Sequence, residues 1–251
     1  MSARLQDRTA LVTGSTDGIG VAVARALAAE GAHVVVSGRD TGRGEKVVAG
    51  IAEWGGRATF VRADLARGAT AVRELAEAAR TATGATLDIL VNNAAMLLTP
   101  TPTGEVPEEV IDRALAINVK AAFLLTGLVA PEMAARGSGA IVNIGSISGL
   151  AGSAGSALYS TTKAAIHSLT KSWAAEYGPH GVRVNTVAPG PTFTEKVAAL
   201  EEYLAPMIMR MPSRRASTPD EVAKAVVFLV GDDASNIHGA TLSVDGGHSA
   251  I

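Results

Sequence analysis

The stretch Thr9–Gly20, TALVTGSTDGIG, decides the fold. Its first part is a short β-branched run of the kind that forms a buried strand. Residues 18–30 continue as GIGVAVARALAAE, an alanine-rich sequence that favours a helix. Between the two, Gly14, Gly18 and Gly20 allow a tight turn whose backbone can approach a pyrophosphate at the helix start. Their spacing is G-x-x-x-G-x-G and not the usual G-x-G-x-x-G, so this turn alone is weak evidence for a nucleotide site.

The same alternation of strand and helix runs through the rest of the chain. Strands are expected at 9–14, 33–38, 58–64, 87–93, 140–146, 182–189 and 240–247. Helices are expected at 18–30, 41–54, 69–83, 107–135, 157–177 and 219–230. Continuous apolar strands between helices indicate a parallel sheet covered on both faces. We therefore predict one doubly wound Rossmann-type α/β domain over residues 1–251, with a mostly parallel seven-stranded sheet and a substrate flap at about 191–217.

Composition excludes several classes of protein. The chain has 251 residues with a net charge of −2, and no block of like charge suggests nucleic acid or an anionic membrane as a partner. It has no cysteine, which rules out disulfides, thiolate catalysis and cysteine-ligated zinc. Its five histidines show no metal-binding spacing, so we expect no metal. Neither a secretory signal nor a membrane span is evident, and we expect a cytoplasmic protein.

Tyr159 and Lys163 form the most informative pair of side chains. They lie four residues apart in a stretch with helical spacing, so both project from one helix face, and Ser146 lies thirteen residues upstream. An adjacent ammonium can lower the pKa of a phenol from its usual value near ~10. A decrease of about three units would need roughly 4 kcal/mol of differential stabilisation of the phenolate. The alternative, a surface tyrosine beside a solvated lysine, stays open on this spacing alone.

Taken together, the motifs resemble the short-chain dehydrogenase/reductase family from end to end. The resemblance rests on TGSTDGIG (13–20), Asp64, NNAA (92–95), Asn118, Ser146, YSTTK (159–163), PG (189–190) and SVDGG (243–247). It implies a catalytic tetrad of Asn118, Ser146, Tyr159 and Lys163. In that reading Tyr159 is the general acid or base, Ser146 orients the carbonyl oxygen, and Lys163 binds the nicotinamide ribose and lowers the pKa of Tyr159. Asn118 would hold a water near Lys163.

The resemblance also implies a set of residues that bind the cofactor. They come from the glycine-rich turn and from the ends of the later strands: Gly14, Ser15, Asp17, Gly18, Ile19, Gly20, Arg39, Asp64, Leu65, Asn92, Ala94, Tyr159, Lys163, Pro189, Gly190, Thr192 and Thr194. For some of them a structural role is also open, since Asp64 can cap the following helix, Asn118 can cap or kink its own, and Ser146 can be an ordinary turn serine.

Which nicotinamide is used depends on the end of the second strand. Relatives that prefer NAD usually carry an acid there to hold the adenosine ribose hydroxyls. This chain has Gly38 followed by Arg39, whose guanidinium could bind a 2′-phosphate with two hydrogen bonds. Asp17 opposes this interpretation, because many relatives that prefer NADP have a basic residue in that turn. We predict NADP over NAD, with Arg43 as a second residue that could help.

The substrate is expected to be a carbonyl compound or alcohol, and no fixed charge is obvious near the reacting centre. The expected pocket is mostly aliphatic and draws on Met96, Leu97, Leu98, Leu150, Ala151, Leu158, Phe193, Leu204, Met207 and Met209. A ketone, a 3-oxoacyl group or a hydrophobic alcohol suits it better than a small diacid. Arg210, Arg214 and Arg215 could attract the phosphate of an acyl thioester carrier, or could simply be solvated. His167 is expected to be a packed helix histidine.

The chain is thus predicted to be an NADP(H)-dependent ketoreductase of the 3-oxoacyl-ACP-reductase-like branch. Alternatives are an NAD-dependent alcohol, sugar or steroid-type dehydrogenase, an epimerase or dehydratase, and a nucleotide-sensing protein without turnover. Family members commonly form tetramers through their two long helices. The alanine-rich stretches 107–135 and 157–177 would permit that packing, so we expect a homotetramer.

Overall fold

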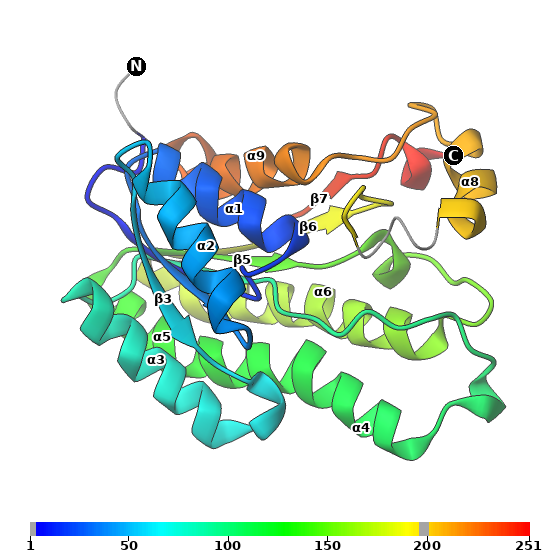
Figure 1. Cartoon of the computed structure of the whole chain (residues 1–251), viewed down its shortest axis with the longest axis horizontal. Helices are drawn as coiled ribbons and strands as arrows, with labels where there is room; N and C mark the ends of the chain where they lie inside the picture. The colour runs from blue at the N-terminus through cyan, green and yellow to red at the C-terminus, as the bar shows by residue number, and fades with distance from the viewer. Residues whose placement is uncertain (1–3, 196–200) are drawn as a thin grey trace.

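The fold is built on one sheet of seven strands, all of them parallel (Figure 1). The computed structural model describes residues 4–195 and 201–251. The strands are β1 Thr9–Thr13, β2 His33–Gly38, β3 Arg57–Arg62, β4 Ile89–Asn92, β5 Gly139–Ile144, β6 Val182–Pro189 and β7 Thr241–Val244. Their order in the sheet is β3-β2-β1-β4-β5-β6-β7. The chain therefore builds the sheet outward from β1 to β3 and then returns to place β4 on the other side of β1. This confirms the predicted Rossmann-type arrangement and makes the sheet wholly parallel.

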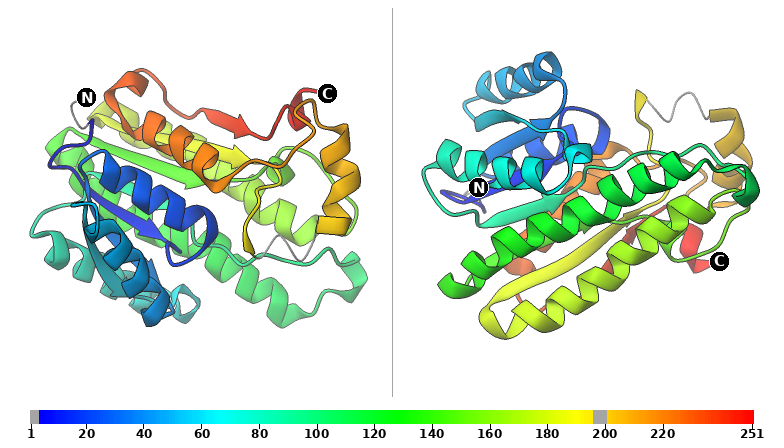
Figure 2. Two further views of the ribbon diagram at one scale, coloured as in Figure 1. Left: turned by 45° about the horizontal axis from the view of Figure 1, so that its top comes forward. Right: turned by 90° about the horizontal axis from the view of Figure 1, so that it is seen from below.

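Helices cover both faces of this sheet (Figures 1 and 2). The helices in the described ranges are α1 Gly18–Ala29, α2 Thr41–Ala52, α3 Ala69–Thr83, α4 Glu108–Leu115, α5 Ala121–Arg136, α6 Ala157–Tyr177, α8 Glu201–Arg210 and α9 Pro219–Val230. One face carries α1, α2 and α9, and the other carries α3, the continuous α4–α5 helix and α6. Seen from below in Figure 2, α5 and α6 lie side by side across the second face.

Alternating side chains of each strand fill two separate cores. In β1, Ala10 and Val12 pack with α1 and α9, whereas Leu11 packs on the opposite side with α3 and α5. All three are fully buried. Full burial of an aliphatic side chain contributes about 1.5–3 kcal/mol, so strands that are apolar on both faces are stable only between two helical layers.

Most expected helices and strands occur within two or three residues of their predicted limits. The bounds of α3, α6, β2, β6 and α9 agree with the prediction. At the start of α9, Thr218 is a helix cap as predicted, and with Glu221 it forms a reciprocal capping box.

Two features were not predicted. The long helix is interrupted by a π-turn at Ala116–Lys120, and the proline-rich stretch 191–217 contains the helix α8. Part of the predicted substrate flap, residues 196–200, lies outside the described residues.

The helix Glu108–Arg136 is long and apolar enough to cross a membrane by length and composition. In the structure it is a layer of the domain instead, because Leu125, Val129 and Met133 on one face are buried against the sheet. About 44% of its apolar window is buried inside the protein.

Candidate active site

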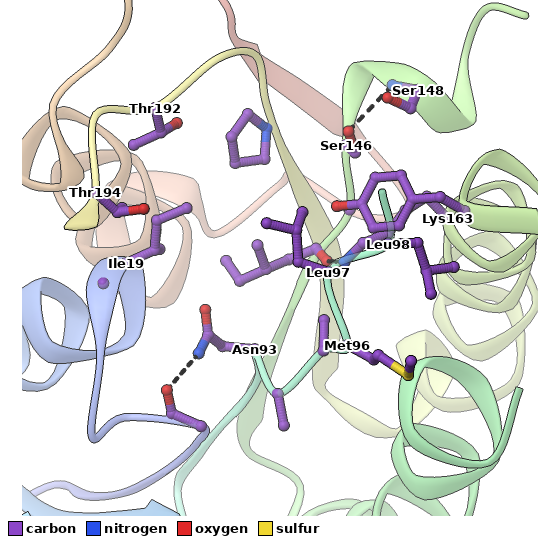
Figure 3. A pocket seen from close by; sticks show the side chains of 18 of the residues that line it. Ile19, Asn93, Met96, Leu97, Leu98, Ser146, Ser148, Lys163, Thr192 and Thr194 are labelled. Carbon is purple, nitrogen blue, oxygen red and sulfur yellow. Dashed lines mark hydrogen bonds between the residues drawn. The ribbon is translucent and has the colours of Figure 1, made fainter. Parts of the chain in front are cut away.

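A cavity of about 860 Å³ lies at the carboxyl edge of the sheet. Its walls come from the segments that follow β1, β2, β3, β4, β5 and β6, together with α4, α6 and α8. Figure 3 shows Ser146 and Lys163 at one side of this cavity and Ile19, Thr192 and Thr194 at the other. The edge where the strand order reverses is where ligands bind in doubly wound folds.

The glycine-rich turn after β1 packs too closely against its neighbours to admit a side chain at two of its glycines. Gly14 and Gly18 have φ values of +64° and +50°, which favour glycine. A Cβ on Gly14 would lie 2.8 Å from the Cα of Ala94, and one on Gly20 would collide with the carbonyl oxygen of Gly14. The turn is thus held against the segment after β4, and Asn93 Nδ2 secures it by donating to the carbonyls of Thr13 and Gly14 at 2.8 and 3.0 Å.

Three predicted site residues are buried and do not line the cavity. Ser15 Oγ donates to the Val12 carbonyl at 2.7 Å and accepts from the Ser37 N–H at 2.9 Å, so it joins β1 to β2. Asn92 Nδ2 donates to Asn143 Oδ1 at 2.9 Å and to the Thr126 hydroxyl at 3.1 Å. Asn118 is the third. The side chains of Ser15 and Asn92 therefore have structural partners.

Basic side chains gather where β2 and β3 end. Arg39 lines the cavity and pairs with no carboxylate in the described part of the chain. Arg43 Nη1 lies 3.3 Å from Asp17 Oδ2, so the acidic group in the turn has a cationic partner. A Cβ on Gly38 would lie 2.5 Å from the Thr16 hydroxyl, which leaves no space for an acid at that position. Asp64 also faces the cavity and caps the short helix after β3 by accepting from the Ala66 N–H at 3.2 Å.

Ser146, Tyr159 and Lys163 come together in one wall of the cavity. Ser146 follows β5, and its Oγ accepts a hydrogen bond from the Ser148 N–H at 3.1 Å. Tyr159 and Lys163 project from the first turns of α6, as their spacing predicted. Lys163 is 4% exposed, donates to the Ile144 carbonyl at 2.8 Å, and has its Nζ 5.7 Å from the centre of the Tyr159 ring.

The pKa values of this pair differ from the expectation. Burial raises the pKa of Tyr159, and its hydrogen bond with Ser146 only partly opposes that effect. Burial also lowers the pKa of Lys163 to about 8. The expected lowering of the tyrosine pKa by lysine is absent here, because the ammonium is directed to the Ile144 carbonyl and desolvation dominates. A phenol with a raised pKa stays protonated at neutral pH and can donate its proton.

Asn118 owes its position to the π-turn, a feature often found at functional sites. Its Oδ1 accepts from the Met96 N–H at 2.7 Å, and its Nδ2 donates to the Met96 carbonyl and the Thr162 hydroxyl, each at 3.2 Å. The side chain is 3% exposed. Asn118 therefore fixes the segment after β4 to α6, immediately behind the cavity wall.

The segment after β6 forms a further wall of the cavity. Pro189, Gly190, Thr192 and Thr194 all line it, and Thr192 pairs with Ser217 in a single parallel bridge. A Cβ on Gly190 would lie 2.9 Å from the Cα of Asp245, so this segment packs against the loop after β7.

The aliphatic lining is smaller than predicted. Residues of the expected set that line the cavity are Met96, Leu97, Leu98, Ala151, Leu204 and Met207. Leu150, Leu158, Phe193 and Met209 are absent from the wall, and Phe193 and Met209 are more than half exposed. Arg210, Arg214 and Arg215 do not line it either, and Arg215 pairs with Glu221 at 2.6 Å.

Sequence reasoning missed Arg113 and His248, which do line the cavity. Neither belongs to a motif. For Arg113, the only signal was its place on the same helix face as Ile117, four residues later.

His167 is a buried structural histidine. Its Nε2 lies 3.0 Å from the Ser146 carbonyl oxygen and its Nδ1 lies 3.2 Å from the Thr241 hydroxyl. It is 6% exposed, and burial lowers its pKa. Among the residues that the structure describes, no three histidine or acidic side chains are grouped so as to hold a metal ion.

The shape of the cavity fits a dinucleotide. The glycine turn opens at the N-terminus of α1, where free N–H groups and the helix dipole favour a pyrophosphate. From there the cavity extends to Arg39 and Asp64 in one direction and to Tyr159 in the other. A dinucleotide has a nucleoside on each side of its pyrophosphate, so it needs space on both sides of this turn.

Comparison with known proteins agrees with this geometry. Residues 14–249 match the family model described as enoyl-(acyl carrier protein) reductase. The chain is 40% identical over 252 residues to cis-4-hydroxycyclohexanecarboxylate dehydrogenase of Sinomonas cyclohexanicum, and the match covers all of both chains. A solved structure described as a short-chain dehydrogenase/reductase family protein is 44% identical with a TM-score of 0.89, and covers 99% of this chain and 100% of its own.

A second solved structure, from Beutenbergia cavernae, contains NADP at low occupancy and is described as an NAD(P)-dependent gluconate 5-dehydrogenase. It is 40% identical to this chain with a TM-score of 0.91, and covers all of both chains. With a hydroxyl donor pair at the end of a dinucleotide cavity and relatives matched over their full length, the chain belongs to the short-chain dehydrogenase/reductase family and is an NAD(P)-dependent oxidoreductase acting on alcohol and carbonyl groups.

Proposed function

We propose that the protein interconverts a ketone and a secondary alcohol with NADP(H), and that Tyr159 is the general acid and base. The observation that carries this proposal is the meeting of Tyr159 and Ser146 in one cavity wall above the buried ammonium of Lys163. The nicotinamide supplies the hydride when it is bound, so the protein must supply a proton to the oxygen. Tyr159 donates that proton, and Ser146 orients the oxygen by a hydrogen bond.

Lys163 and Asn118 support this proton transfer. We assign Lys163 to the ribose hydroxyls of the nicotinamide half, because its ammonium lies below Tyr159 with two N–H bonds beyond the one given to Ile144. The lowered pKa of about 8 also allows Lys163 to exchange protons near neutral pH. Asn118 is assigned the positioning of this region, since its amide joins Met96 to Thr162.

For the cofactor we propose the following contacts. The turn from Gly14 to Gly20 holds the pyrophosphate, Asp64 and Leu65 meet the adenine, and Pro189 to Thr194 hold the nicotinamide side, all from the cavity wall. Ala94 adds backbone contact. Ser15 and Asn92 act from behind that wall, since their side chains hold the strands that carry it.

NADP is the proposed cofactor in preference to NAD. At the adenosine end, Arg39 pairs with no carboxylate among the described residues, and Arg43 offsets the carboxylate of Asp17. The Thr16 side chain also leaves no room at Gly38 for the acid typical of NAD enzymes. We expect kcat/KM to be higher with NADPH than with NADH, and Arg39→Asp to reverse that order. At least tenfold better use of NADH by the unaltered enzyme would overturn the assignment.

The substrate class is tested by oxidation of NADPH at 340 nm over a panel of carbonyl compounds. The panel contains 3-oxoacyl thioesters, sugars, steroid-like ketones and cyclic ketones, because the name of one relative includes a hydroxycyclohexane ring and that of another includes gluconate. We expect the fastest turnover with cyclic or aliphatic ketones, since the wall near Tyr159 carries Met96, Leu97 and Leu98. Cofactor binding without turnover of any compound would favour a nucleotide sensor instead.

We further propose that the protein is a cytoplasmic homotetramer. Two large apolar side chains on the α4–α5 helix, Leu115 and Phe123, are 39% and 52% exposed. Phe123 also contacts the buried Trp173 of α6, with ring centres 6.0 Å apart, so this surface lies beside α6. Large apolar side chains exposed along one helix are typical of a surface that another copy covers. Residues 191–217, as far as they are described, are proposed to act as the substrate flap.

A further inference from the structure

Positive charge lines the end of the cavity where the substrate would bind. The charged side chains in the wall fall into two groups. Asp17, Arg39 and Asp64 lie at the adenosine end, and Lys163 and Arg113 lie at the end that also contains Met96, Leu97, Leu98 and Pro100. Within the described ranges, no aspartate or glutamate lines this second end. The charged groups at this end are thus both cationic, beside neutral polar groups such as Ser146 and Tyr159.

Of the two cations, only Arg113 is available to a substrate. Lys163 is buried beneath Tyr159 and donates to the Ile144 carbonyl. Arg113 is exposed, and its guanidinium forms no ion pair or hydrogen bond with any side chain that the structure describes, its helix neighbours Glu109 and Asp112 included. The five N–H donors of this guanidinium therefore have no side-chain partner among the described residues.

The position of Arg113 is set by the same elements that hold the catalytic residues. It lies in α4, four residues before Ile117 on the same helix face, and both line the cavity. Asn118 follows directly and is bonded to Met96. Since a helix rises about 1.5 Å per residue, the Cα of Arg113 lies roughly 7.5 Å before that of Asn118 along the helix axis.

The helices α4 and α6 also pack against each other, as Figure 1 shows. Arg113 is therefore carried on the same rigid unit as Tyr159, which lies in the first turn of α6. A group bound by the guanidinium would be held at a set distance from the reacting oxygen.

We propose that Arg113 binds a carboxylate of the substrate, and that the enzyme acts on oxo and hydroxy acids whose acidic group is separated from the reacting carbon by an aliphatic or alicyclic spacer. This inference rests on the proposed function and names its substrate class. A carboxylate matches the planar fork of a guanidinium and carries the single charge that one arginine neutralises, whereas a phosphate dianion would need a second cation. Met96, Leu97 and Leu98 would contact the spacer.

The test compares three ketones that differ in one substituent: 4-oxocyclohexanecarboxylate, its neutral carboxamide and cyclohexanone. Each is reduced with NADPH by the unaltered enzyme and by Arg113→Met, Arg113→Lys and Arg73→Ala. Arg73 is a matched control, because it is an exposed arginine on α3 that does not line the cavity. Arg113→Met has a similar length and apolar volume but no charge.

We expect the unaltered enzyme to prefer the carboxylate to the carboxamide by at least tenfold in kcat/KM. Arg113→Met should lose that preference, mainly through KM for the carboxylate, and Arg113→Lys should retain part of it. Arg73→Ala should keep all of it. If Arg113→Met and the unaltered enzyme show the same ratio within twofold, the inference is wrong.

A binding measurement separates this inference from the proposed function. Cyclohexanecarboxylate and cyclohexanecarboxamide are titrated into the enzyme saturated with NADP⁺, and heat is recorded for the unaltered protein and Arg113→Met. The inference requires tighter binding of the acid that is lost in the variant, whether or not any ketone is turned over. Turnover of neutral ketones alone, with equal binding of acid and amide, would leave the proposed function intact and refute the role of Arg113.

Discussion

The imidazole of His167 connects Ser146 to the last strand, and its role can be tested at a single residue. Its Nε2 lies 3.0 Å from the Ser146 carbonyl oxygen, and its Nδ1 lies 3.2 Å from the Thr241 hydroxyl. The neutral ring can donate to the carbonyl from Nε2 and accept from the hydroxyl at Nδ1. Both groups are thereby satisfied inside the protein.

Replacing His167 with leucine should remove one of the two donors to the Ser146 carbonyl, which keeps the Gly149 N–H at 3.0 Å. The loss of one hydrogen bond costs about 0.5–1.5 kcal/mol, or roughly 1–6 °C in Tm for a chain of this size. We expect His167→Leu to lower both Tm and kcat, and His167→Gln, which keeps a donor, to recover part of each. Thermal unfolding followed by steady-state kinetics checks this, and equal loss in the two variants would show that the hydrogen bond is unimportant.

One part-buried and one buried histidine make stability depend on pH. Burial lowers the pKa of His33 and His167 from the ordinary value of 6.5. Below pH 6.5 the unfolded chain binds protons that the folded chain does not, so unfolding becomes more favourable as pH falls. We expect the free energy of unfolding to decrease between about pH 6.5 and 5, and the slope to be smaller in His167→Gln. Denaturant unfolding at several pH values measures it, and a stability that rises on acidification would contradict it.

At the residue scale, the spacing of these residues predicted their positions but not the direction in which the tyrosine pKa is shifted. The tyrosine and lysine share one face of α6 as their separation required, and Ser146 lies at the end of β5. The direction of the tyrosine pKa could not be predicted in this way. It depends on how deeply the ring is buried and on the carbonyl that binds Lys163, and neither is visible in the order of the residues.

At the scale of an element, the turn before α1 is the part most sensitive to a single methyl group. A Cβ on Gly20 would collide with the Gly14 carbonyl oxygen and approach Asn93 Nδ2 to 2.6 Å. Gly20→Ala should therefore displace the turn, lower Tm and raise KM for NADPH by at least tenfold.

Gly50→Ala in α2 is the matched control for this substitution. Its Cβ would meet only Arg25 Nη2 at 3.5 Å, an ordinary contact, and alanine is favoured over glycine within a helix by about 0.5–1 kcal/mol. We expect Tm to rise by about 1–4 °C and KM to stay within twofold. If Gly20→Ala behaved like Gly50→Ala in both measurements, close backbone packing would not explain the glycine at position 20.

The two elements that the sequence did not predict were missed for a common physical reason. The π-turn at Ala116–Lys120 lies inside a run with uniform helical propensity, and within it Asn118 bonds the backbone of Met96. The helix α8 contains Pro206 and lies in the stretch predicted to be a substrate flap. In both cases tertiary contact or position overrides a local signal, whereas α3 and α9, with clear apolar periodicity and caps, were located correctly.

At the scale of the whole molecule, the class of fold was predictable but the strand order was not. Apolar strands alternating with helices imply a parallel sheet, yet local patterns do not say that β4 pairs with β1 instead of β3. Because β4 pairs with β1, the strand order reverses beside the glycine turn. The loops that line the cavity then all lie at the same edge of the sheet. Arg113 was missed for the same reason, because its helix reaches the site only through this arrangement.

The proposed homotetramer is a prediction at this scale. A chain of 25.4 kDa should elute as a species of about 100 kDa by light scattering. Phe123→Glu would place a charge on the exposed apolar surface of α5 and should yield smaller species. The control is Phe193→Glu, which alters an equally exposed ring on another segment and should leave the mass unchanged. A monomer in the unaltered protein would contradict the prediction.

The central claim is that the Tyr159 hydroxyl exchanges the proton with the substrate oxygen. Tyr159→Phe removes that hydroxyl and keeps the ring that packs beside Lys163. Because positioned general acids contribute about 10²–10⁴ in rate, single-turnover reduction of the best ketone in the panel should slow by at least a hundredfold in the variant, at a cofactor concentration that saturates both proteins. An undiminished rate in Tyr159→Phe would contradict the account.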